Sequence, residues 1–225
     1  MKGYIKIIIV IIIFISIVTT TSIFPSIEPD YLYIIFNEVS QPAGIQHITP
    51  TWGVTWADVN NDGWEDIYIN NHHFFPALYD GQTPPLLFLN NGDMTFQNVA
   101  DDYGILPVGD FHGSAWADFN NDSFTDLFQT QGGAGGFGRF PNRLYKNNGD
   151  GTFDEIAKTA GVVMEPARGR TGFWLDYNLD GFLDLYICNL FHPGYPSTLM
   201  RNNGDETFTD VGSELGLKMP AYIMG

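Results

Sequence analysis

The order of hydrophobic and polar residues along this chain predicts short β-strands joined by tight turns. After residue 30, short apolar runs such as residues 67–69 and 185–187 are separated by clusters rich in Asn, Asp and Gly. Such runs are typical of strands, and Asn, Asp and Gly favour the turns between them. Long stretches of Leu, Ala, Glu and Lys, which would indicate helices, are missing from the sequence. We therefore expect an all-β fold.

Two sequence motifs recur three times in the same order. A nine-residue motif rich in Asp begins at Asp58, Asp118 and Asp176, and the motif Asn-Asn-Gly-Asp-x-Thr-Phe follows at residues 90–96, 147–153 and 202–208. Each repeat contains a short strand before the Asp loop, an apolar strand after it and a hairpin across Asn-Gly, whose glycine supplies positive φ. Four strands in about 55–60 residues match the size of a propeller blade. The repeats cover about residues 51–107, 108–163 and 164–220, and Trp56, Trp116 and Trp174 occupy matching slots that we expect to lie in the core between blades.

Residues 31–45 have the form of the end of a further repeat. Phe36 and the pair Gly44-Ile45 have the same spacing as Phe96 and Gly104-Ile105. We interpret this segment as a closing strand, the fourth strand of a blade whose other strands are missing from the sequence. Because a propeller needs four to eight blades, we expect the chain to be a fragment with about three blades and one closing strand.

The first residues of the chain predict export from the cytosol. Lys2 and Lys6 precede the apolar run 7–18, and small residues follow up to Ser22. A basic start, an apolar core of this length and small residues behind it are typical of a secretory signal peptide, here residues 1–27. Residues 7–27 carry no charge and are long enough to be an uncleaved membrane anchor instead. Both alternatives place residues 28–225 outside the cytosol, as a secreted, extracellular or periplasmic protein.

The composition excludes some classes of function. Asp plus Glu number 26 and Lys plus Arg number 10, so the formal net charge is -16. Such an acidic chain lacks the basic surface that nucleic acids require. The one cysteine, Cys188, cannot form an internal disulfide, and we expect it to pack as a small hydrophobic residue. Because many of the acids are clustered in the three loops, cations are the expected partners.

The three Asp loops have the ligand spacing of a calcium site. Counted from the first Asp, oxygen-bearing side chains stand at positions 1, 3, 5 and 9, and position 7 adds a backbone carbonyl. In chain order these positions are Asp58, Asn60, Asp62, Trp64 and Asp66; Asp118, Asn120, Asp122, Phe124 and Asp126; Asp176, Asn178, Asp180, Phe182 and Asp184. Ca²⁺ takes six to eight oxygen ligands, whereas Mg²⁺ prefers a strict octahedron and retains its waters. We therefore expect about one Ca²⁺ per loop, three in this chain.

The loops differ from EF-hands and from ordinary turns. An EF-hand has Glu at position 12, where these loops have Ile69, Gln129 and Ile187, and strands rather than helices follow them. Turn formation alone is the alternative reading, but it does not explain acids at positions 1, 5 and 9 in all three copies. The second loop departs from the pattern because Ser123 stands at position 6, where a glycine with positive φ is expected.

At this level of detail the chain resembles a known repeat family. The motif Asp-x-Asn-x-Asp-Gly-x-x-Asp followed by Asn-Asn-Gly-Asp-Gly-Thr-Phe resembles the FG-GAP/VCBS repeat, which builds the propellers of integrin alpha chains. The chain also resembles the cartilage acidic protein (ASPIC/UnbV) group. The shared features are the tripeptides that lead into the first two Asp loops, Trp56-Ala-Asp58 and Trp116-Ala-Asp118, and the run Asn142 to Tyr145. The resemblance covers about residues 31–225. It implies a calcium-binding propeller with an extracellular, adhesion-like role.

The expected function is an extracellular binding or adhesion scaffold for a protein or a glycan, and not an enzyme. The alternative is a secreted lyase or hydrolase that acts on polysaccharides. Its candidate residues are His72, His73, His112, His192, Arg139 and Arg143. The histidines do not recur in register, and no nucleophile motif or acid pair accompanies them, so packing within variable loops is the favoured interpretation.

Overall fold

The structure is a computed structural model of the whole chain. Seven stretches of the chain are described. These stretches are residues 36–46, 51–71, 84–105, 109–132, 140–164, 168–190 and 196–218. They contain twelve β-strands and one helix of a single turn, α1 (Ala157–Ala160). The expected all-β fold is therefore confirmed.

The twelve strands form three antiparallel sheets of four strands, each in sequence order. The first sheet contains β1 (Thr51–Ala57), β2 (Asp66–Asn71), β3 (Leu86–Asn90) and β4 (Phe96–Asn98). The second contains β5 (Phe111–Ala117), β6 (Asp126–Gln131), β7 (Arg143–Asn147) and β8 (Phe153–Glu155). The third contains β9 (Gly169–Leu175), β10 (Asp184–Asn189), β11 (Thr198–Asn202) and β12 (Phe208–Asp210). The expectation of four strands in each repeat is confirmed.

All three sheets share one register. In the first sheet, Trp56 pairs with Ile67, Ile67 with Phe88, and Phe88 with Asn98. The equivalent ladders are Trp116, Leu127, Tyr145 and Glu155 in the second sheet and Trp174, Leu185, Met200 and Asp210 in the third. A slip of one residue would turn every side chain to the opposite face of its sheet. Equivalent residues of the three repeats therefore lie on equivalent faces.

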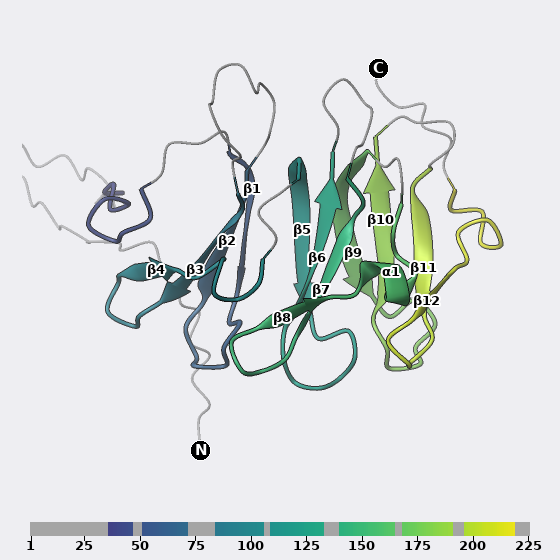
Figure 1. Cartoon of the computed structure of the whole chain (residues 1–225). Helices are drawn as coiled ribbons and strands as arrows, with labels where there is room; N and C mark the ends of the chain where they lie inside the picture. Colours follow the sequence, from purple (N-terminus) through teal and green to yellow (C-terminus); the bar gives the residue numbers. More distant parts are fainter. Residues whose placement is uncertain are drawn as a thin grey trace, which may run out of the picture.

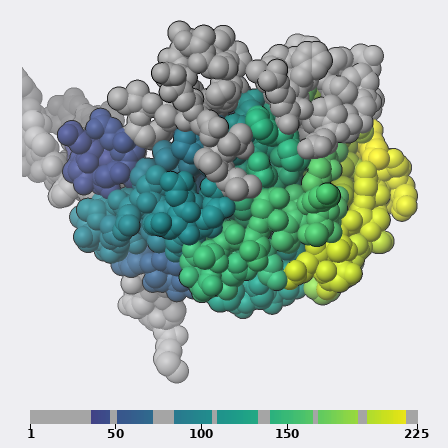
Figure 2. Space-filling model, viewed as in Figure 1, coloured from purple at the N-terminus to yellow at the C-terminus, as the bar shows by residue number. Residues whose placement is uncertain are grey.

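The sheets lie side by side in sequence order, with β1, β5 and β9 next to one another (Figure 1). Figure 2 shows the same order on the molecular surface, from purple to yellow. The hydroxyl groups of Thr55 and Ser114 are 2.9 Å apart and join β1 to β5. The indole N–H of Trp174 donates to the carbonyl of Ala115, 3.2 Å away, and joins β9 to β5. Each sheet thus contacts the next through its first strand.

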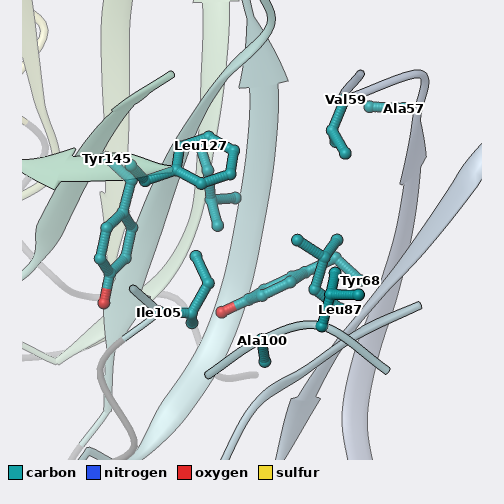
Figure 3. Packing of buried hydrophobic residues seen from close by; sticks show 10 residues of the cluster. Ala57, Val59, Tyr68, Leu87, Ala100, Ile105, Leu127 and Tyr145 are labelled. Atoms are coloured by element: carbon teal, nitrogen blue, oxygen red, sulfur yellow. The ribbon is translucent and has the colours of Figure 1, made fainter. Parts of the chain in front are cut away.

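Hydrophobic cores fill the junctions between consecutive sheets. Figure 3 shows Tyr68 and Leu87 of the first sheet and Leu127 and Tyr145 of the second around one core, which also includes Ile105. An equivalent core joins the second and third sheets and contains Leu144, Val162, Leu185 and Met200. Each large buried side chain contributes about 1.5–3 kcal/mol to folding. The sheets are therefore held together by burial between repeats as well as within them.

The same turn geometry follows the fourth strand of each sheet. After β4, the N–H groups of Tyr103 and Ile105 donate to the carbonyls of Val99 and Ala100, both at 2.9 Å. Gly104 has φ +76°, in the left-handed region that favours glycine. The turns after β8 and β12 have glycines at the same place, Gly161 and Gly216, with φ +79° and +69°. We call these segments terminal turns.

Residues 39–45 form a fourth terminal turn. The N–H of Ala43 donates to the carbonyl of Val39 at 2.9 Å, and Gly44 has φ +78°. In all four segments a side-chain oxygen accepts the N–H two residues later, namely from Glu38 to Ser40, Asn98 to Ala100, Glu155 to Ala157 and Asp210 to Gly212. Residues 36–39, however, pair with no strand, and residues 31–35 lie outside the described part. In its described residues, from Phe36 onward, the segment expected as a closing strand thus has the turn of a repeat end and no strand ladder.

The predicted signal peptide or anchor, residues 1–27, lies outside the described residues. Within the described stretches, no helix is long and apolar enough to cross a membrane. Cys188 in β10 is half-buried with a free thiol, and burial raises the pKa of that thiol. A raised pKa makes a thiol less reactive at neutral pH, which fits a packing role.

Candidate metal centres

The three Asp loops join the first strand of each sheet to its second strand, and the first Asp organises each loop. Both carboxylate oxygens of Asp58 accept backbone N–H groups, from Asp62 at 3.0 Å and Gly63 at 2.8 Å. Asp118 and Asp176 accept the equivalent N–H groups at 2.8 to 3.1 Å. The chain is thereby wrapped around the carboxylate at position 1.

The side chains at positions 3 and 5 complete the same arrangement. Asn60 accepts the N–H of Asp62 at 3.1 Å and donates its own amide to the Asp62 carboxylate at 2.9 Å. The other carboxylate oxygen of Asp62 accepts the N–H of Trp64 at 2.8 Å. The second and third loops repeat these bonds. Because a carboxylate or amide oxygen has two lone pairs, each of these oxygens keeps acceptor capacity for a cation.

Positive φ angles close the loops at positions 4 and 6. In the first loop Asn61 has φ +58° and Gly63 has φ +87°, and Gly181 of the third loop has φ +89°. Ser123 takes the same backbone conformation with φ +74°. The expectation of positive φ at position 6 is therefore confirmed. A side chain in this region costs about 1–2 kcal/mol, so at position 6 the second loop carries a strain that Gly63 and Gly181 avoid in the other two loops.

The Asp at position 9 is buried and ties the loop to the hairpin of its own sheet. The carboxylate of Asp66 accepts the N–H of Val59 at 3.0 Å and the N–H of Asn90 at 2.8 Å. Asp126 and Asp184 make the same two bonds. Burial raises the pKa of Asp66 to about 6 and of Asp126 to about 7, and it also raises the pKa of Asp184. The carboxylates at position 9 are thus partly desolvated, and each one joins its Asp loop to the hairpin of the same sheet. The spacing of the motif does not indicate this structural role.

The structure brings together the predicted ligands at positions 1, 3 and 5 of each loop, but within the described residues it does not gather three carboxylates into one cluster. Among the described residues, no group of three or more His, Cys, Asp or Glu side chains is arranged to hold a metal. In the same stretches, the nine loop carboxylates form no ion pair with Lys, Arg or His. The residues that could hold a cation are therefore the Asp, Asn and Asp at positions 1, 3 and 5 and the carbonyl at position 7, with the position-9 Asp beside them.

Asparagine side chains connect the loops of consecutive repeats. The amide of Asn61 donates to the carbonyl of Ser123 in the second loop at 3.0 Å, and the amide of Asn121 donates to Gly181 in the third loop at 3.2 Å. At the corresponding position of the third loop stands Leu179, whose side chain is exposed. The three candidate sites are therefore linked in series.

An ion pair lies beside the second loop. Lys146 of β7 pairs with Glu206 in the hairpin of the third repeat, and this bond raises the pKa of Lys146. The same Glu206 carboxylate is 3.4 Å from the amide of Asn120. The positive charge of Lys146 is attracted to Asp122 and Asp126. The second candidate site thus has a neighbouring cation as well as a strained backbone.

The structure describes two of the residues considered for an enzyme, His112 and Arg143. His112 in β5 is buried, with its Nδ1 atom 2.6 Å from Nη1 of Arg170 and its Nε2 atom 3.5 Å from Asp110. Trp52 packs against its ring at a centroid distance of 5.0 Å. Arg143 begins β7, and the other candidates, His72, His73, Arg139 and His192, lie outside the described residues. His112 is therefore held in a packed polar cluster between the sheets.

Comparison with known proteins gives three curated relatives. Over 184 residues the chain is 27% identical to cartilage acidic protein 1 of Homo sapiens. The aligned region covers 80% of this chain and 27% of the relative. Over 136 residues it is 31% identical to cartilage acidic protein 1 of Xenopus tropicalis, covering 60% of this chain and 20% of the relative. Over 184 residues it is 26% identical to the protein of that name in Mus musculus, with coverage of 80% and 27%.

The chain is similar to cartilage acidic protein 1. This finding supports the resemblance to the cartilage acidic protein group. No family model matches the chain. The chain spans between 20% and 27% of the length of the curated relatives it matches.

Proposed function

We propose that this chain is a calcium-binding segment of a β-propeller in an exported protein, and that it acts as a scaffold for binding a protein or a glycan. The observation that carries the proposal is the threefold recurrence of one loop geometry. In each copy the same backbone N–H groups orient the oxygens at positions 1, 3 and 5. Turn formation alone does not require two carboxylates and an amide at these positions in every copy.

The donor set suits Ca²⁺ better than other metals. Carboxylate, amide and carbonyl oxygens are hard ligands, and the loops contain neither sulfur nor imidazole. In the first loop Asp58, Asn60 and Asp62 and the carbonyl of Trp64 would hold the ion. Asp66 would add a carboxylate, and water would complete the six to eight oxygens that Ca²⁺ takes. The bound ion supplies positive charge to carboxylates that otherwise repel one another.

Calcium is expected to stabilise the fold because the loops exist only in the folded chain. A ligand that binds the folded state alone stabilises it by about 2.7 kcal/mol per site at a hundredfold excess over Kd. The buried carboxylates at position 9 strengthen this argument, since a nearby cation favours their charged form. Removal of calcium should therefore lower the melting temperature.

Calorimetry on the chain from residue 28 onward tests the calcium proposal. Titration of CaCl₂ should release or absorb heat with about three sites per chain, and MgCl₂ should give a much weaker signal. The variant carrying Asp58→Asn, Asp118→Asn and Asp176→Asn should lose most of the heat. Asp101→Asn, an exposed Asp outside the loops, is the matched control. Absence of any heat from the unmodified chain at millimolar calcium would reject the proposal.

The propeller assignment rests on the way the sheets are joined. Consecutive four-stranded sheets contact one another through their first strands and share the cores between them. A propeller is built by repeating four-stranded sheets radially around an axis, and the side-by-side order of these sheets supports that assignment. The resemblance to FG-GAP/VCBS repeats and the similarity to cartilage acidic protein 1 support the same assignment.

The proposed scaffold is an exported protein, and it does not catalyse a reaction. The basic and apolar start of the chain supports export, and the acidic composition argues against nucleic acid as a partner. For an enzyme, His112 and Arg143 are the candidates that the structure describes, and the contacts of buried His112 with Arg170, Asp110 and Trp52 support a structural role instead. Hydrolysis or elimination of a polysaccharide by the chain, lost in His112→Ala, would overturn the scaffold proposal.

A further inference from the structure

Uncharged side chains lie beside the first Asp loop where the second repeat meets it. Leu89 of β3 and Tyr103 of the first terminal turn pack against the core between the first two sheets. Burial raises the pKa of Tyr103, and the charges of Asp66 and Asp62 raise it further, so its hydroxyl lies near the first loop. A Cβ atom on Gly151, in the hairpin of the second repeat, would lie 3.6 Å from that hydroxyl. A leucine, a tyrosine and a glycine therefore surround this part of the first loop.

The three corresponding positions at the second Asp loop have all changed. The leucine position holds Lys146, the tyrosine position holds Ala160, and the glycine position holds Glu206. Ala160 is buried and much shorter than a tyrosine, so it leaves room for longer side chains beside the loop. Lys146 and Glu206 form an ion pair there, although Lys146 belongs to the second repeat and Glu206 to the third. An uncharged junction has thus been exchanged for an ion pair that spans two repeats.

The hairpin of the third repeat does not itself require a glutamate at position 206. Glu206 has φ +65°, in the region that favours glycine, and Gly151 takes the same place in the second repeat with φ +87°. Such strained residues persist where surrounding contacts hold them, and they are frequent at functional sites. The contacts of Glu206 are those to Lys146 and to Asn120, at position 3 of the second loop. The side chain of Glu206 therefore serves the neighbouring repeat.

Glu206 helps to orient the amide of Asn120. The nitrogen of this amide donates to the carboxylate of Asp122 at 2.8 Å and lies 3.4 Å from the carboxylate of Glu206. The amide oxygen, on the other side, accepts the N–H of Asp122 at 3.3 Å. An acceptor that holds the nitrogen of an amide keeps its oxygen turned toward the loop, and such outer contacts strengthen metal binding by the ligand they hold. Gly151, at the first loop, has no side chain that could do the same.

Lys146 has the opposite effect because its charge is positive. Its bond to Glu206 raises the pKa of Lys146 most, and the charges of Asp122 and Asp126 raise it further, so the ammonium group lies near the second loop. In the absence of a metal ion, this ammonium group offsets part of the repulsion among the loop carboxylates. A divalent cation bound in the loop would be repelled by it. Lys146 is therefore expected to weaken calcium binding, and Glu206 to strengthen it.

We infer that the second calcium site is shared between two repeats and tuned by their ion pair. Glu206 of the third repeat is a positioning residue for the ligand Asn120, and Lys146 of the second repeat is a built-in competing charge. The inference rests on the proposed calcium binding of the loops. It goes beyond that proposal because it makes the second site differ in kind from the first. Calcium affinity at the second loop then depends on a hairpin outside its own repeat.

Two variants of the chain from residue 28 onward isolate the sites for calorimetric titration with CaCl₂. The second-loop chain carries Asp58→Asn and Asp176→Asn, and the first-loop chain carries Asp118→Asn and Asp176→Asn. In the second-loop chain, Glu206→Gln should weaken calcium binding about threefold to tenfold. Lys146→Met should strengthen it about threefold. In the first-loop chain, both substitutions should leave the Kd unchanged.

Matched controls separate the effect of charge at the site from a change in folding. Glu214→Gln and Lys158→Met make the same substitutions at exposed positions outside the loops and should leave both affinities unchanged. Far-UV circular dichroism of every variant should equal that of the unmodified chain. Raising the salt concentration from about 0.05 M to about 0.5 M should reduce the effect of Lys146→Met, because salt screens the repulsion between its ammonium group and the ion. A purely structural role for Lys146 would not produce this dependence on salt.

The outcomes distinguish this inference from the proposed function. If calcium binds but the two substitutions in the second-loop chain have no effect, or shift its affinity in the same direction, the inference is wrong and the proposed function stands. Equal shifts in the first-loop chain would reject the inference in the same way. A second-loop chain that gives no heat, and gains none from Lys146→Met, would also reject it. Absence of heat from the unmodified chain would reject the proposed function and the inference together.

Discussion

The side-chain amide of Asn147 donates a hydrogen bond to the carbonyl of Val59, 2.8 Å away and 88 residues earlier in the chain. Asn147 begins the hairpin of the second repeat, and Val59 is position 2 of the first Asp loop. Asn202 makes the same 2.8 Å bond to Phe119. The first and second Asp loops are therefore each fastened to the hairpin of the following repeat, so a change in one candidate site can reach the next.

Replacing Asn147 tests this link. Asn147→Ala removes its bonds to Val59 and to Thr125 and takes the donor from the buried carbonyl of Val59. We expect a loss of about 1–3 kcal/mol in the free energy of unfolding, measured by urea denaturation. Asn148→Ala is the control, because Asn148 is exposed and bonds only locally to Thr152. Equal effects of the two substitutions would contradict the assigned role.

The two tryptophans Trp174 and Trp56 should respond differently to the same substitution. Trp174 stacks on Phe119 at a centroid distance of 6.0 Å and donates to Ala115, whereas Trp56 is exposed. Trp174→Phe should lower the free energy of unfolding by about 1–3 kcal/mol. Trp56→Phe should change it by less than about 0.5 kcal/mol. Thermal unfolding of both variants at low protein concentration measures the difference, and a large effect at Trp56 would argue against its exposure.

Relief of backbone strain should stabilise the second loop. Ser123 has φ +74°, and glycine adopts this conformation without a steric penalty. The gain is partly offset because glycine makes the unfolded chain more flexible. Ser123→Gly should therefore raise the free energy of unfolding by about 0.5–1 kcal/mol and tighten calcium binding at this loop. The reciprocal Gly63→Ser should lower both quantities, and the idea fails if both substitutions shift stability in the same direction.

The ion pair between Asp210, at the end of β12, and Lys218 predicts that the stability of the fold depends on pH. Burial tends to raise the pKa of Asp210, but hydrogen bonds from Thr198, Lys218 and the N–H of Gly212 outweigh it and hold the pKa below the usual 3.8. A lowered pKa means that this stabilisation is present above the unfolded pKa and is lost as the pH falls through the folded pKa. Because both partners are more than a third exposed, the contribution should be below about 1 kcal/mol.

Chemical denaturation between about pH 2 and pH 6 measures this contribution. The stability difference between the unmodified chain and Asp210→Asn should be largest at the upper end and should disappear at the lower end. Asp154→Asn, an exposed Asp of β8, serves as the control. A difference that grows as the pH falls would have the wrong sign for the proposed cause.

Several features could be predicted from the sequence because they are local. The Asn-Gly hairpins and position 6 of the loops need positive φ, and Gly92, Gly149 and Gly204 adopt it in the hairpins. The repeat spacing indicated four strands per unit, which the three sheets confirm. Short-range geometry depends on a few neighbouring residues, so the residue types themselves carry this information.

The role of Asp66 could not be predicted from its place in the motif. Sequence spacing put it among the predicted metal ligands, and the structure adds that this buried carboxylate accepts the N–H groups of Val59 and Asn90. Asn90 is 24 residues further along the chain, and only the folding of the hairpin back onto the loop brings the two together. The link between Asn147 and Val59 was missed for the same reason.

The sequence by itself determined the repeat, the strand order within a repeat and the oxygen atoms offered by each loop, because these follow from residue type and spacing. Only the tertiary structure decided which equivalent residues are covered. Trp174 and Trp56 have the same place in their repeats, yet one packs against a preceding sheet and the other is exposed. Burial depends on what lies beside a repeat in space, and identical motifs carry no record of their neighbours.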